Sequence, residues 1–124
     1  MKKTILLADH DPAVRRMLCR VLAGENYHVL SAGNGEEILD LFDGARIDLA
    51  LVERNLPLKS GRDAFEWLSA ENPSVPLIII TAQPHQIAKA PAPGVGVSME
   101  KPLDLAKLLC VIRGLLRSET SFGR

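Results

Sequence analysis

Short apolar runs alternate along this chain with segments of helical periodicity, and this alternation restricts the possible folds more than any other feature. The run at residues 4–8 is apolar almost throughout and stops at charged residues, as is typical of a strand buried on both faces of a parallel sheet. Four further strands are expected, over residues 27–31, 49–52, 77–80 and 95–99. Strands that alternate with helices predict an α/β fold with a parallel sheet and right-handed connections.

The expected helices begin at residues that suit helix termini. Asp11 and Pro12 open the first, because aspartate is a good N-cap and proline fits the first helical position. Residues 84–96 contain three prolines and have room for at most about two turns of helix, so the fourth helix should be short or irregular. The other helices are expected over 12–24, from 34 onward, 62–69 and 104–117, and the inward positions of the first are Val14, Met17, Leu18, Val21 and Leu22.

The length of 124 residues fits one domain, which we expect over residues 1–117, followed by a flexible tail at 118–124. Fifteen basic and fifteen acidic residues give no net charge, which argues against binding to nucleic acid or to an anionic membrane. No run suits a membrane span or a secretory signal, and we interpret the chain as cytoplasmic. Cys19 and Cys110 fit two buried thiols in a reducing compartment.

Polar residues follow the expected strands at the edge where a doubly wound sheet carries its functional site, beyond the carboxyl ends of the strands. The first, third, fourth and fifth strands each contribute a cluster. The clusters are Asp9-His10-Asp11, Glu53-Arg54-Asn55, Thr81-Ala82 and Lys101-Pro102.

These clusters, in this order and with Leu56-Pro57 and Gly61 after the third strand, resemble the receiver domain of two-component response regulators over nearly the whole chain. The resemblance implies a flavodoxin-like, doubly wound (βα)5 sandwich with strand order 2-1-3-4-5. It also implies that position 53 holds the carboxylate that accepts a phosphoryl group from a histidine kinase, assisted by Mg²⁺. The implied site consists of Asp9, position 10 and the Asn55 carbonyl as metal ligands, Thr81 and Lys101 as contacts to the phosphoryl oxygens, and Pro102 after a bond that is cis in many receivers.

Three positions depart from the pattern that the resemblance implies. The phosphoacceptor position is Glu53 in place of aspartate, which moves the carboxylate by one C–C bond, about 1.5 Å. His10 replaces an acidic Mg²⁺ ligand and should weaken Mg²⁺ binding, so we expect no cofactor or a weakly held Mg²⁺. Ser98 stands where an aromatic switch residue is common. The longer Glu53 side chain is expected to reach Lys101 and partly mimic a phosphoryl group.

Our leading interpretation is therefore an atypical receiver that acts by protein–protein interaction and is not an enzyme. One alternative is an active receiver in which Glu53 or Asp11 accepts the phosphoryl group with another divalent ion. Asp9, His10 and Glu53 are also a candidate set for Zn²⁺ or Mn²⁺, beside the interpretation of His10 as a solvated remnant. A small enzyme or nucleotide binder of the same fold is the alternative of another class, although no glycine-rich loop follows the first strand.

The resemblance implies a histidine kinase, phosphotransfer protein or output protein as partner. A homodimer would use the face built from the fourth strand to the last helix, which Ser98 and residues 84–96 should reshape. Trp67 is a candidate interface anchor or a half-buried core residue. His28 and His85 are interpreted as structural or solvated.

Overall fold

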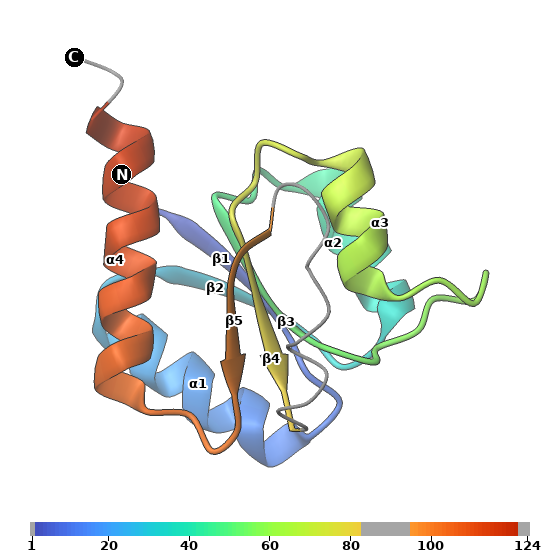
Figure 1. Ribbon diagram of the computed structural model, residues 1–124, viewed down its shortest axis with the longest axis horizontal. Helices are drawn as coiled ribbons and strands as arrows, with labels where there is room; N and C mark the ends of the chain where they lie inside the picture. Colours follow the sequence, from blue (N-terminus) through green and yellow to red (C-terminus); the bar gives the residue numbers. More distant parts are fainter. Residues whose placement is uncertain (1, 83–94, 122–124) are drawn as a thin grey trace.

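The computed structural model describes residues 2–82 and 95–121. Five parallel strands form one sheet in the order β2-β1-β3-β4-β5, which confirms the predicted α/β fold and strand order (Figure 1). The strands are β1 (Thr4–Ala8), β2 (His28–Ala32), β3 (Leu49–Glu53), β4 (Leu77–Thr81) and β5 (Val95–Glu100). The helices within the described residues are α1 (Pro12–Gly24), α2 (Gly35–Gly44), α3 (Ala64–Glu71) and α4 (Leu105–Ser121).

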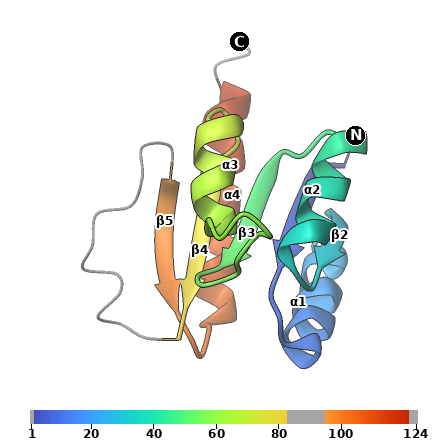
Figure 2. The same cartoon turned by 90° about the vertical axis from the view of Figure 1, so that its right-hand side faces the viewer.

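Helices cover both faces of the sheet, with α1 and α4 on one face and α2 and α3 on the other (Figures 1 and 2). All residues of β3 and β4 are buried, because each of these inner strands has a helical layer on both sides. Each face has its own core. Leu18, Leu108 and Ile112 are among the buried residues of one core, and Ile38, Phe65 and Leu68 of the other.

Two helix starts show the local signals expected from the sequence. Asp11 caps α1 by accepting a hydrogen bond from the Ala13 N–H at 2.9 Å. Asn34 caps α2 by accepting from the Glu37 N–H at 3.0 Å. Gly35 must lack a side chain, since a Cβ there would lie 2.7 Å from the Pro57 carbonyl oxygen. These contacts fix the turns that lead away from the functional edge of the sheet.

Some boundaries and burial predictions were wrong. The last helix continues past Arg117 to Ser121, because no glycine or proline interrupts that segment, so the predicted tail begins inside α4. Met17 was expected in the core and is 40% exposed. Both cysteines are free thiols, but the prediction that they are buried was wrong, since Cys19 is only half-buried and Cys110 is exposed.

Other predictions fall on helices and strands whose limits moved by one or two residues. The second strand begins at His28, and the third helix begins at Ala64. The His28 side chain is exposed, which agrees with the solvated of its two interpretations. The predicted short fourth helix and His85 lie outside the described residues. No helix in the described part of the chain is long and apolar enough to cross a membrane.

Candidate functional site

The four clusters predicted from the sequence meet at one edge of the sheet. Glu53 and Thr81 are the last residues of the neighbouring strands β3 and β4, and Asp9 directly follows β1. Lys101 directly follows β5, and its N–H donates to the Thr81 carbonyl at 2.8 Å. The parallel register therefore brings two carboxylates, a hydroxyl and an ammonium to the carboxyl ends of adjacent strands.

Both carboxylate oxygens of Glu53 contact His10. The His10 backbone N–H donates to Oε1 at 2.8 Å, and Nδ1 of the imidazole lies 2.7 Å from Oε1 and 2.8 Å from Oε2. The Glu53 side chain is 11% exposed, whereas that of His10 is 71% exposed. A largely buried carboxylate is thus covered from the solvent side by a histidine ring.

Asp9 and Lys101 are the other two charged residues of the cluster. Asp9 is fully buried, and its Oδ1 accepts a hydrogen bond from the Asp11 N–H at 2.9 Å. Its Oδ2 accepts no hydrogen bond of ordinary geometry, and the Lys101 Nζ lies 3.0 Å away as its charge partner. The same Nζ is 3.4 Å from Glu53 Oε2, as the sequence led us to expect. Lys101 therefore bridges the two carboxylates.

The protonation equilibria of the site follow from these contacts. Burial raises the pKa of the Glu53 carboxyl, but the hydrogen bonds from His10 and the Lys101 ammonium outweigh it and hold this pKa below its ordinary value. The hydrogen bond to Glu53, and then its negative charge, raise the pKa of His10. Burial lowers the pKa of Lys101, but Asp9 and Glu53 more than offset this and raise it. The contacts favour an ionised Glu53 and protonated His10 and Lys101.

The remaining predicted residues lie around this cluster in different roles. Asp11 points into the α1 cap, and only its backbone N–H contacts the cluster, through Asp9. Asn55 is exposed and has a positive φ of 67°, a conformation that asparagine tolerates. Ser98 is half-buried on β5, opposite Ile79 of β4. The bond between Lys101 and Pro102 is cis, as in many receivers, a point that the sequence left open.

Some contacts of the site were not foreseen from the sequence. The interpretation of His10 as a solvated remnant missed its contacts with Glu53, although Asp9, His10 and Glu53 do lie together, with ligand atoms within 4.8 Å of one another. Arg15 of α1 donates to the Asp9 carbonyl at 2.6 Å. Arg54, which belongs to the cluster predicted after the third strand, lies over the Phe65 ring, 5.0 Å from its centre. Arg15 could have been found from its position one helical turn after the N-cap.

A parallel sheet of this order, with carboxylates after β1 and at the end of β3 and a lysine before a cis proline after β5, defines the receiver class of signalling domain. The family model described as "Response regulator receiver domain" matches residues 5–113, and the chain therefore belongs to this family.

Curated relatives are regulators of greater length. The chain is 31% identical over 122 residues to the response regulator MprA of Mycolicibacterium vanbaalenii, a match that covers 97% of this chain and 53% of the relative. It is 32% identical over 115 residues to the transcriptional regulatory protein CpxR of Escherichia coli, covering 91% of this chain and 49% of CpxR. The chain thus spans about half the length of the curated relatives it matches.

Solved structures agree on the fold. The signal receiver domain of an HD domain-containing protein from Pseudomonas fluorescens superimposes with a TM-score of 0.86 at 27% identity, covering 98% of this chain and 99% of that one. The response regulator TrrA of Thermotoga maritima, solved in complex with Mg(2+)-BeF, gives a TM-score of 0.80 at 26% identity, covering 92% and 99%.

Proposed function

We propose that this chain is an atypical receiver module that acts through protein–protein contacts without forming an acyl phosphate. The observation that carries the proposal is the engagement of both Glu53 oxygens by His10, with Lys101 against Oε2 as well. Phosphoryl transfer needs a carboxylate oxygen free to attack in line with the leaving group. Here each oxygen of the carboxylate at the acceptor position already has a charged or hydrogen-bonding neighbour.

With His10 protonated, the form that its raised pKa favours, the charges of the cluster also balance without a metal ion. Asp9 and Glu53 contribute two negative charges, and Lys101 and protonated His10 contribute two positive charges. A divalent cation placed here would meet an ammonium and an imidazolium at short range. It would have to displace at least one of them from its carboxylate partner, at a cost in electrostatic free energy.

The donor set does not fit Mg²⁺. Mg²⁺ prefers oxygen ligands in octahedral geometry, and position 10 offers a ring nitrogen. Asp9 Oδ1 already accepts from the Asp11 N–H, and Asp9 Oδ2, which accepts no hydrogen bond, has the Lys101 ammonium as its charge partner at 3.0 Å. No step of the proposed function therefore involves Mg²⁺.

Receiver domains interact with histidine kinases and output domains, and we infer a cytoplasmic protein of this kind as the partner. The contact surface that we propose is the face of β4, β5 and α4, which a second copy could also use. Ser98 on β5 cannot act as an aromatic switch residue, so this face should not respond to events at Glu53 as it would with a tyrosine. This supports constitutive binding.

One observation favours a second candidate function. The ligand atoms of Asp9, His10 and Glu53 lie within 4.8 Å of one another, a grouping that suits an ion that accepts both nitrogen and oxygen ligands, such as Zn²⁺ or Mn²⁺. In that case the chain would be an active receiver with Glu53 as the phosphoacceptor.

The deciding experiment is intact-mass spectrometry after incubation with acetyl phosphate, run without metal and with Mg²⁺, Mn²⁺ or Zn²⁺. We expect no phosphoryl adduct on the native chain under any of these conditions. The matched comparison is the Glu53→Asp/His10→Asp variant, which we expect to gain an adduct in Mg²⁺, because it regains a shorter acceptor and an oxygen ligand.

An adduct on the native chain that disappears in Glu53→Gln would overturn the proposal. If that adduct required Mn²⁺ or Zn²⁺, it would establish the second candidate function. Adding Ser98→Tyr to the double variant tests the switch: phosphorylation should then change its self-association in sedimentation velocity. Equal association with and without the adduct would refute the role given to position 98.

A further inference from the structure

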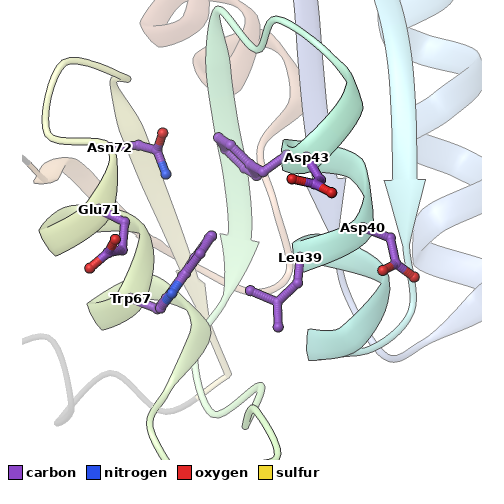
Figure 3. Close-up of a pocket in the computed structure, with 7 residues that line it drawn as sticks. Leu39, Asp40, Asp43, Trp67, Glu71 and Asn72 are labelled. Carbon is purple, nitrogen blue, oxygen red and sulfur yellow. The ribbon is translucent and has the colours of Figure 1, made fainter.

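A second feature lies away from the sheet edge, in a groove between α2 and α3. The groove has a volume of about 460 Å³ and is lined by Leu39, Asp40, Phe42, Asp43, Trp67, Glu71 and Asn72. Figure 3 shows Leu39 of α2 and Trp67 of α3 facing each other across the space between the two helices. The groove involves none of the residues of the cluster around Glu53.

The floor of the groove is apolar and aromatic. Leu39, Phe42 and Trp67 are half-buried and pack against the core under α2 and α3. The Phe42 and Trp67 rings meet edge to face, with their centres 6.0 Å apart and their planes at 80°. An indole held in this way presents a fixed, partly accessible surface, which suits an anchor for a partner side chain.

The two helices that form the groove are acidic, although the chain as a whole has no net charge. Neither helix contains a lysine or an arginine. Among the described residues, Asp40, Asp43 and Glu71 are exposed and form no ion pair. The acidic residues are Glu36, Glu37, Asp40 and Asp43 in α2 and Glu66 and Glu71 in α3.

Two of these carboxylates stand where they destabilise their own helices. Asp43 lies in the last turn of α2, and Glu71 is the last residue of α3. The carboxyl end of a helix carries a partial negative charge, so an acidic side chain there is unfavourable and a basic one is favourable. Both helix ends lie at the same groove, since Asp43 and Glu71 line it. The groove therefore combines the partial negative charges of two helix termini with exposed carboxylates.

We propose that this groove binds a basic peptide segment of a partner protein, with an arginine stacked on Trp67 and its charge compensated by Asp43 and Glu71. Arginine fits best because its planar guanidinium stacks on an indole and also donates several hydrogen bonds to carboxylates. A leucine or similar apolar side chain next to it would contact Leu39 and Phe42. The inference does not depend on whether Glu53 can be phosphorylated.

The chain supplies its own reporter for the test, because Trp67 is its single tryptophan. The probe is the N-acetylated peptide amide Arg-Leu-Arg-Arg-Leu-Arg, titrated into the full chain while Trp67 fluorescence is recorded. We expect a saturable change that weakens with added salt, and none with the peptide in which glutamate replaces arginine. No change in fluorescence with the basic peptide would overturn the proposal.

Two charge variants separate the groove from the general acidity of these helices. Asp43→Asn/Glu71→Gln removes two charges at the groove and should weaken binding about fivefold, from two partly exposed ion pairs. Glu36→Gln/Glu66→Gln removes two charges from the first turns of the same helices and should change the Kd less than twofold. Melting curves by circular dichroism confirm that both variants are folded.

Equal weakening of peptide binding in the two variants would show attraction to net charge alone and would refute the groove as the binding site.

A second copy of the chain is the competing occupant of the groove, since α1 carries Arg15, Arg16 and Arg20 and no acidic residue. Sedimentation velocity without peptide decides this point. A monomer that binds the peptide supports the proposal, whereas self-association abolished by Asp43→Asn/Glu71→Gln would replace the partner segment with a second chain.

Discussion

Replacing His10 with aspartate is the sharpest test of how the charged cluster is held together. The imidazole nitrogen lies 2.7 Å from Glu53 Oε1, and the His10 side chain is 71% exposed. At that separation, with a dielectric constant of about 80, an attraction between unit charges is worth about 1.5 kcal/mol. Aspartate would turn this attraction into a repulsion, a nominal swing of about 3 kcal/mol.

The measured loss should be smaller than this limit. Salt screening and rotation of the new side chain into solvent reduce exposed interactions, so we expect His10→Asp to lower the free energy of unfolding by about 1–2 kcal/mol. For a domain of this size, that corresponds to a decrease in Tm of roughly 4–8 °C. His10→Asn is the matched control, because it removes the cation without adding a negative charge, and it should lose about half as much.

Magnesium should rescue only the aspartate variant. Position 10 would then offer an oxygen ligand beside Asp9 and Glu53, and a Kd of about 1 mM would return about 1.4 kcal/mol at about 10 mM Mg²⁺. Thermal denaturation followed by circular dichroism, with and without Mg²⁺, measures all of these quantities. A His10→Asp variant as stable as the native chain in the absence of Mg²⁺ would refute the pairing. An equal effect of Mg²⁺ on the native chain would refute the metal argument.

Two other perturbations test the same region. The His10 pKa is raised above its ordinary value of 6.5, so its stabilising contribution is complete below pH 6.5 and is lost as the pH rises through the raised pKa. The Glu53 pKa is lowered from 4.5, so its contribution is complete above pH 4.5 and is lost as the pH falls through the lowered pKa. The Tm at constant ionic strength should therefore be highest between about pH 4.5 and 6.5, and a His10→Asn variant should not share the alkaline decrease. Asp11→Ala removes the α1 cap and should cost about 1 kcal/mol in urea unfolding; a cost that depended on added divalent cations would instead assign Asp11 to a metal site.

The sequence was sufficient for the sheet and for the residues gathered at its edge, because both depend on local pattern. Buried parallel strands are short apolar runs, and polar residues that follow such strands meet at the same edge whatever their sequence separation. The contact between Glu53 and Lys101 was predictable from the added length of a glutamate side chain. The strand order came from the resemblance to receivers and not from the pattern itself.

The sequence alone did not determine which charged side chains of the cluster pair with one another. Asp9, His10, Glu53 and Lys101 could pair in several ways, and side-chain rotamers at the strand ends decide among them. His10 also contacts Glu53 through both its backbone N–H and its ring, and only the ring contacts depend on the residue type. The groove at Trp67 was missed for a different reason, because it needs the relative position of two helices that are separated by a strand.

We propose that the two departures at positions 10 and 53 from the receiver pattern act together as one change. With aspartate at position 10, the cluster would hold three carboxylates and one ammonium, and only a divalent cation could balance it. Histidine removes one negative charge and, in the protonated form that its raised pKa favours, adds a positive one, which brings the net charge of the cluster to zero without any ion. The longer Glu53 then reaches both the imidazole and Lys101 from the end of β3. His10→Asp alone should leave the Glu53 side chain too long, and Glu53→Asp alone should leave a histidine where Mg²⁺ needs an oxygen ligand. Recovery of phosphorylation should therefore require both substitutions and exceed the sum of their separate effects.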